Sequence, residues 1–152
     1  MDASELYDPE FRKLIKSKKP TIIIPVGSLE QHGAHLPITT DSDIVTDIAS
    51  RLAKKCGFIA FPTISYGISH EHEPLFNTSI SEYTLKKLLK NILQSLVTNG
   101  ITSGIILNGH HGNHKTLDKF VNEWWKYMDN RRAESDYIEY GFRCKSYSYW
   151  HF

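Results

Sequence analysis

The chain has 152 residues, of which 40% are hydrophobic and 23% are charged, and its net charge is +1. This length and composition are typical of a single globular domain and exclude a long disordered chain. The small net charge disfavours binding to the phosphate backbone of nucleic acids, so we expect no nucleic-acid partner.

The apolar segments are too short for a membrane protein. The longest run, Ile22 to Val26, is far below the roughly 20 residues of a spanning helix, and the first residues lack the basic-then-apolar order of a signal peptide. We therefore expect a cytoplasmic protein with no membrane partner. Cys56 and Cys144 are expected to pack as small apolar side chains rather than to form a disulfide.

Hydrophobic spacing predicts helices and strands that alternate along the chain. In order, we expect a helix over 8–16, a strand over 21–26, a helix from 41 or 42 to about 55, a strand over 58–61, a helix from 81 to 99–100, a strand over 104–107, a helix over 114–128 and strand residues within 137–150. Asp41 or Ser42 is the expected cap of the second helix. Alternation of this kind predicts an α/β fold, with a parallel sheet covered by helices on both faces.

Histidines are the unusual feature of the composition. Seven of the eight fall in three short windows: His32 and His35; His70 and His72; His110, His111 and His114. Each window lies at or just beyond the end of a predicted strand, and the polar segment 62–78 is long enough to be a site loop. Because ligands of parallel sheets bind at the carboxyl ends of the strands, these windows predict one common site.

The donor atoms in these windows suit a transition metal. Glu30, His32 and Asp41 follow the first strand, and His110 follows the third. Mixed oxygen and nitrogen donors favour zinc, manganese or iron over calcium. Asp41 could bridge two metals, which together activate water and polarise a bond for hydrolysis. Its other possible role is the helix cap, and one oxygen could serve each role.

Two motifs carry a resemblance to a known family. Gly27-Ser28-Leu29-Glu30-Gln31-His32-Gly33, followed by Leu36-Pro37 and Thr40-Asp41, resembles the signature of the creatininase (creatinine amidohydrolase) family. Asn108-Gly109-His110-His111-Gly112-Asn113 is similar to the turn Asn-Gly-His-x-x-Asn of that family. The resemblance implies a three-layer α/β/α domain over 1–152 with a mainly parallel sheet, a metal-dependent amidohydrolase that acts on linear or cyclic amides, and a homo-oligomer.

The same resemblance implies a ligand set. Glu30 and His110 would hold one divalent metal, His32 another, and Asp41 would bridge them, with zinc as the first expectation and manganese or iron as alternatives. These four residues are also the expected catalytic residues, acting through metal-activated water. His72, His111 and Asn113 are expected to line the space for a small-molecule amide substrate.

The sequence also departs from the family pattern. Gly112 stands where creatininase has a metal-binding glutamate, the downstream motif His-Ala-Gly…Glu-Thr-Ser is absent, and Leu75-Phe76-Asn77-Thr78 replaces Phe-Pro-Gly-Thr. Glu71, Glu73 or a neighbouring subunit would then supply the missing carboxylate. The alternative hypothesis is a shortened, catalytically silent homologue that acts in binding or assembly, with the aromatic tail 147–152 at an interface. A weaker third hypothesis is phosphate binding by the backbone of 108–113.

Overall fold

The computed structural model describes residues 1–134 and 143–148, with side chains up to residue 128. The expected parallel sheet is confirmed. It contains β1 (Ile22–Val26), β2 (Ile59–Ala60), β3 (Ser103–Asn108) and β4 (Arg143–Ser148), in the order β2-β1-β3-β4. Each neighbouring pair is parallel, and Ile22 of β1 lies opposite both Ile59 of β2 and Gly104 of β3.

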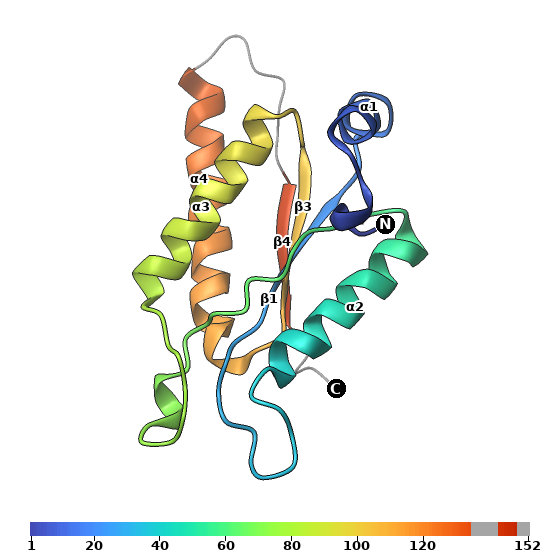
Figure 1. The fold of residues 1–152 in the computed structure, drawn as a ribbon. Coiled ribbons are helices and arrows are strands. Elements are labelled where there is room, and N and C mark those ends of the chain that lie inside the picture. The colour runs from blue at the N-terminus through green and yellow to red at the C-terminus, as the bar shows by residue number, and fades with distance from the viewer. Residues whose placement is uncertain (135–142, 149–152) are drawn as a thin grey trace.

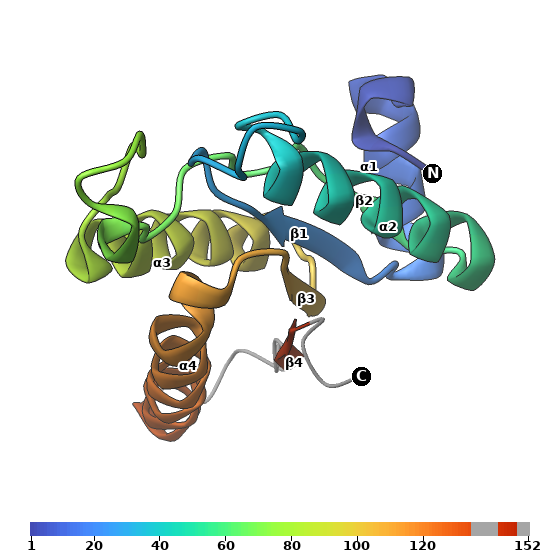
Figure 2. The same cartoon turned by 90° about the horizontal axis from the view of Figure 1, so that it is seen from below.

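Helices cover both faces of this sheet and complete the three layers. The helices are α1 (Asp8–Lys18), α2 (Thr40–Cys56), α3 (Glu82–Thr98) and α4 (His114–Glu134), with short 3-10 turns η1 (Ala3–Glu5), η2 (His70–His72) and η3 (His111–Asn113). Figure 2 shows α2 on one side of β1 and β3, and α4 on the other. No helix in the described ranges combines the length and apolar character that crossing a membrane would need.

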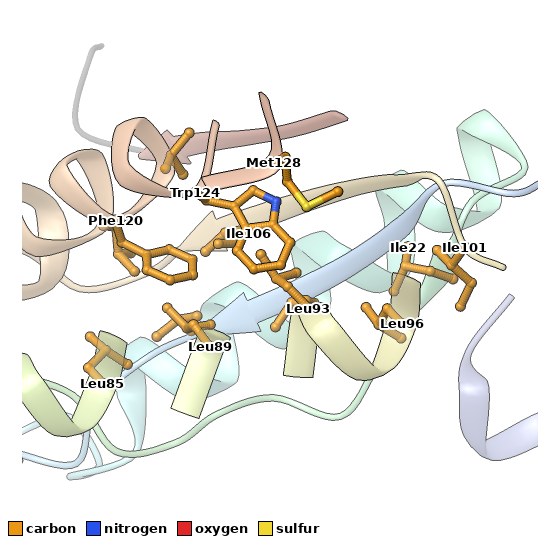
Figure 3. Packing of buried hydrophobic residues seen from close by; sticks show 14 of the residues in the cluster. Ile22, Leu85, Leu89, Leu93, Leu96, Ile101, Ile106, Phe120, Trp124 and Met128 are labelled. Carbon is orange, nitrogen blue, oxygen red and sulfur yellow. The ribbon is translucent and has the colours of Figure 1, made fainter. Parts of the chain in front are cut away.

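The core follows from the alternation of side chains along β1. Ile22, Ile24 and Val26 pack with α3 and α4, whereas Ile23 packs with α2. Figure 3 shows the larger cluster, in which Leu89 and Leu93 of α3 meet side chains of α4 and the sheet. Burial on both faces explains why β1 is continuously apolar.

Helix boundaries agree with the sequence at some ends and differ at others. Ser81 caps α3, and its side chain accepts a hydrogen bond of 3.1 Å from the backbone of Thr84. Gly57 ends α2 in the left-handed conformation, with φ of 69°. The expected capping of α2 by Asp41 or Ser42 is wrong, because α2 already begins at Thr40 and Asp41 lies within its first turn.

Several side chains are more exposed than the sequence patterns predict. Ile44 and Leu88 occupy apolar positions in the helical spacing of α2 and α3, yet Ile44 is 49% exposed and Leu88 is 39% exposed. Cys56 is also exposed at the end of α2, so the expectation that it packs as an apolar side chain is wrong. The predicted strand within 137–150 corresponds to β4, and its other residues lie outside the described part, as does the end of the aromatic tail.

The carboxyl ends of β1 and β3 bring three loops to one end of the sheet. The segment 27–39 after β1 and the turn at 109–113 lie at the lower end of the molecule in Figure 1, and the segment 61–81 runs down from the level of the sheet to the same end. Gly109 permits this convergence, since a Cβ there would lie 2.6 Å from Val45 Cβ and 2.8 Å from the Asp41 carbonyl oxygen. The start of α2 therefore packs directly against the end of β3.

Candidate metal centre

Three segments that are remote in sequence contribute buried polar side chains to one point. Glu30 is 2% exposed, Asp41 6% and His110 2%. His110 Nδ1 lies 2.8 Å from Asp41 Oδ2 and 3.2 Å from Glu30 Oε1. Burial of two carboxylates is unfavourable unless a positive charge or several hydrogen-bond donors compensate it. The cluster must therefore contain or bind such a compensating group.

Asp41 faces two imidazoles with its two oxygens. Oδ2 meets His110 and also accepts a 2.8 Å hydrogen bond from the Ser28 hydroxyl, while Oδ1 lies 3.0 Å from His32 Nε2. One donor atom each of Glu30, His32 and Asp41 fall within 4.8 Å of one another. This is the arrangement that a bridging carboxylate between two cations would need.

The imidazole of His110 is held from behind by the main chain. Its Nε2 donates a 2.7 Å hydrogen bond to the carbonyl oxygen of Ile68, which leaves Nδ1 directed at the carboxylates. The backbone of His110 is also fixed, because Asn108 Oδ1 accepts from its N–H and Asn108 Nδ2 donates to its carbonyl. Such outer contacts fix the ring orientation of histidine ligands in metal sites.

The pKa values reflect the mutual pairing of these groups. Burial acts to raise the pKa values of the Glu30 and Asp41 carboxyl groups. Hydrogen bonds from His110 to both groups and from Ser28 to Asp41, with the contribution of the Ser69 side chain at Glu30, outweigh burial, so both pKa values lie below their ordinary values. Burial acts to lower the pKa of His110, whereas its hydrogen bonds to Asp41 and Glu30 raise it to about 10. Without a cation, a proton on His110 therefore lies between two carboxylates at neutral pH.

One atom of this cluster has its bonding capacity unused. Glu30 Oε2 is buried and has no hydrogen-bond partner among the described residues, although Oε1 of the same carboxylate faces two imidazoles. The Ser69 hydroxyl is likewise buried without a partner there, and the Ser69 side chain helps to lower the pKa of Glu30. Buried carboxylate oxygens are normally satisfied, because an unpaired one loses its hydration without compensation. A cation bound beside Glu30 would satisfy this oxygen, so the residues present fit a divalent metal.

The three residues expected to line a substrate space, His72, His111 and Asn113, lie in three different surroundings. His72 lies 3.1 Å from Glu30 Oε1 through its Nε2, and His111 is exposed at the start of η3. Asn113 is fully buried: its Nδ2 donates to the Gly27 carbonyl and its Oδ1 accepts from the Ile68 N–H. In this structure Asn113 therefore joins two site loops instead of facing open space.

Two acidic residues were candidates for the missing carboxylate. Glu71 Oε1 lies 3.6 Å from His110 Nε2, on the side of the ring away from Asp41. A Cβ at Gly112 would lie 2.4 Å from that oxygen and 2.1 Å from the Ile68 carbonyl, so a side chain at 112 would require both to move. Glu73 is exposed and pairs with His70 at 3.5 Å, so it does not join the cluster.

Sequence reasoning missed the residues that support the candidate ligands. Ser28 and Gln31 lie within the first motif but were not assigned roles, and Ile68 acts only through its backbone. Ser28 could have been suspected, because a small hydroxyl beside a strand end is a suitable donor to a buried carboxylate. The backbone role of Ile68 leaves no signal in the identity of its side chain.

The comparison with known families gives one extensive match. The profile described as "Creatininase: Creatinine amidohydrolase" matches residues 4–150. The mycofactocin precursor peptide peptidase of Mycolicibacterium smegmatis is 37% identical over 111 residues, which are 68% of this chain and 44% of that protein. The 2-amino-5-formylamino-6-ribosylaminopyrimidin-4(3H)-one 5'-monophosphate deformylase of Methanosphaera stadtmanae is 38% identical over 103 residues, 63% of this chain and 42% of that protein.

Solved structures agree with the fold described above. A crystal structure of creatinine amidohydrolase matches with a TM-score of 0.84 and 26% identity, covering 98% of this chain and 57% of that one. A creatininase structure described as the Mn form has a TM-score of 0.85 at 25% identity, and a mutant described as the Zn–Zn type has 0.83 at 26%; each match covers 98% of this chain and 58% of the other. The chain thus spans less than half of the curated relatives and somewhat more than half of the solved chains.

Proposed function

Since this chain belongs to the creatininase family, we propose that it forms the metal-binding part of an amide hydrolase, with Glu30, Asp41 and His110 as ligands of a first divalent cation. The observation that carries the proposal is their convergence around His110 Nδ1, together with the unsatisfied Glu30 Oε2. Zinc is the first candidate, with manganese and iron as alternatives, because the donors are mixed oxygen and nitrogen. The proposed substrate class is a small-molecule linear or cyclic amide.

When bound, such a cation supplies Lewis-acid polarisation of a carbonyl group and lowers the pKa of water. The side chains of this chain provide the remaining requirements. Ser28 holds Asp41 Oδ2, Ile68 holds His110 Nε2, and together they set the donor atoms before any ligand arrives. Preorganised donors do not need to be reoriented during binding or reaction.

We propose that Asp41 Oδ1 and His32 Nε2 form the start of a second, weaker cation site. Their 3.0 Å separation and the position of Asp41 between two imidazoles support this assignment. His32 is less buried than His110, with a side chain 19% exposed against 3%. Fewer buried donors at the His32 side predict lower affinity there than at the His110 side.

Metal analysis tests the first cation site. The protein is purified without chelator and analysed by plasma mass spectrometry, and we expect close to one equivalent of a transition metal. Asp41→Ala and His110→Ala should lose that metal, whereas Asp43→Ala should keep it, because the exposed Asp43 carboxylate accepts a 2.7 Å hydrogen bond from Thr39, just before α2, and is not one of the proposed ligands. Wild-type protein with less than about 0.2 equivalents after incubation with zinc or manganese would contradict the proposal.

Hydrolysis assays separate the active protein from the silent homologue. A panel of linear and cyclic amides is incubated with protein loaded with zinc, manganese or iron. Turnover that depends on metal and is abolished in Glu30→Gln supports the hydrolase. Full metal occupancy without turnover on any substrate would favour the alternative role in binding or assembly. The proposed homo-oligomer is tested separately by light scattering, where a monomeric mass would contradict it.

A further inference from the structure

The loop that contains η2 contributes an imidazole to the buried carboxylate of Glu30. His72 Nε2 lies 3.1 Å from Glu30 Oε1, and its other ring nitrogen, Nδ1, lies 2.8 Å from Gln31 Nε2. The two loops are also joined through their backbones, since Gln31 N–H donates to the Phe76 carbonyl at 2.8 Å. His72 therefore connects a side chain of the first motif with a candidate metal ligand.

The orientation of the Gln31 amide follows from a second contact. The backbone N–H of Gly33 donates a 2.9 Å hydrogen bond to Gln31 Oε1. If the amide were reversed, its NH₂ group would face the Gly33 N–H, and two donors would oppose each other. The amide nitrogen of Gln31 is thus the atom that faces His72.

The tautomer of His72 follows from that orientation. An amide nitrogen can only donate, so His72 Nδ1 must accept, and the proton of a neutral ring must be on Nε2. This proton points at Glu30 Oε1, which therefore accepts from His72 on one side and meets His110 Nδ1 at 3.2 Å on the other. The rotation of the carboxylate about its bond is fixed, and Oε2 is the oxygen left without a partner among the described residues.

We propose that His72 is a positioning residue, locked by Gln31 in its Nε2–H form, which orients the Glu30 carboxylate so that Oε2 is presented to the cation. The effect on cation binding rests on the proposed function. The orientation of the Glu30 carboxylate by His72 is a property of the metal-free protein. Outer donors to ligating carboxylates commonly change metal affinity when they are removed.

The first experiment measures the tautomer directly. Nitrogen-15 NMR of the histidine side chains in the metal-free protein should show His72 with Nε2 protonated and Nδ1 unprotonated. In Gln31→Glu, a carboxylate that only accepts would face Nδ1, so Nδ1 should become protonated. A wild-type ring protonated at Nδ1, or an unchanged Nδ1 in Gln31→Glu, would overturn the proposal. A purely packing role of His72 would not produce this exchange.

The second experiment measures Zn²⁺ affinity by competition with a chromophoric chelator. His72→Leu keeps similar volume without a donor and should weaken binding about 10- to 100-fold, whereas His72→Gln keeps an N–H donor and should retain most of the affinity. His70→Leu is the matched control on the same 3-10 turn, because the exposed His70 side chain pairs with Glu73 at 3.5 Å, and the variant should bind Zn²⁺ as wild type does.

The two experiments keep the proposals distinguishable. Equal Zn²⁺ affinity of His72→Leu and wild type would overturn the positioning role while leaving the metal site intact. If wild-type protein binds no Zn²⁺, the proposed function fails, and the NMR tautomers in wild type and Gln31→Glu alone decide whether His72 orients Glu30.

Discussion

The contact between the end of β3 and the start of α2 gives a sharp test of how the site is built. Gly109→Ala adds a single methyl group, whose carbon would lie 2.6 Å from Val45 Cβ and 2.8 Å from the Asp41 carbonyl oxygen. Ordinary carbon contacts are about 3.5–4.0 Å, so α2 and β3 would have to separate by roughly 1 Å. Neither contacting atom is at the end of a flexible side chain, so the backbone must move.

Overpacking of this kind costs about 1–3 kcal/mol, and we expect the upper part of that range because one of the contacts is with backbone. With a urea dependence of about 2 kcal/mol per molar, the unfolding midpoint should fall by roughly 1 M. Since Asp41 itself would shift, Zn²⁺ affinity should also fall in the folded variant. Circular dichroism during urea unfolding and chelator competition measure the two effects.

Gly57→Ala, at the other end of α2, is the control. A Cβ there meets nothing within 4 Å, and only its φ of 69° is unfavourable for alanine. It should cost about 1 kcal/mol by backbone strain and leave Zn²⁺ affinity unchanged. If Gly109→Ala unfolds at the wild-type midpoint and binds Zn²⁺ as wild type does, the proposed close packing of α2 on β3 is refuted.

Three further predictions concern protonation, the core and a helix end. Because the pKa of His110 is raised from 6.5 to about 10, its pairing stabilises metal-free protein fully below pH 6.5, and stability measured by urea unfolding should decline as pH rises towards 10. Cation binding must release this proton, so Zn²⁺ affinity should rise about tenfold per pH unit between 7 and 9, measured by calorimetry in two buffers. Leu89→Ala should destabilise the protein by about 2–5 kcal/mol in urea unfolding, because Leu89 is fully buried between α3 and the sheet. Ser81→Ala should cost about 1 kcal/mol in the same assay by removing the cap of α3, and a loss below a few tenths would contradict that role.

The fold was predictable because its main signals are periodic. Leu85, Leu89 and Leu93 follow the spacing of a buried helix face, and all three are fully buried in α3. Strands that alternate with helices also indicated that segments after β1 and β3 would meet at one end of the sheet. The convergence of Glu30, Asp41 and His110 follows from this topology, because Glu30 follows β1, His110 follows β3, and Asp41 lies in the helix after β1.

The supporting contacts were not predictable, because they depend on the path of irregular loops. The contact of His72 with Glu30 joins residues 42 positions apart in the chain, and no periodicity places one beside the other. Asp41 was considered as a helix cap from local preference, but its carboxylate instead receives donors from Ser28 and two histidines. The preference of aspartate for helix caps is therefore outweighed at Asp41 by tertiary hydrogen bonds, which form only after folding.

The main chain of Ile68 connects two parts of the site, since its N–H is held by Asn113 and its carbonyl holds His110. An alanine scan would therefore overlook this position: Ile68→Ala removes only the side chain, which contributes to core packing, and keeps both backbone groups. Replacing a peptide bond of Ile68 by an ester would instead reveal how far the site depends on this backbone, because the ester changes the N–H or carbonyl group that forms the hydrogen bond. At Ile68 the side chain therefore serves the core, whereas the backbone serves the site.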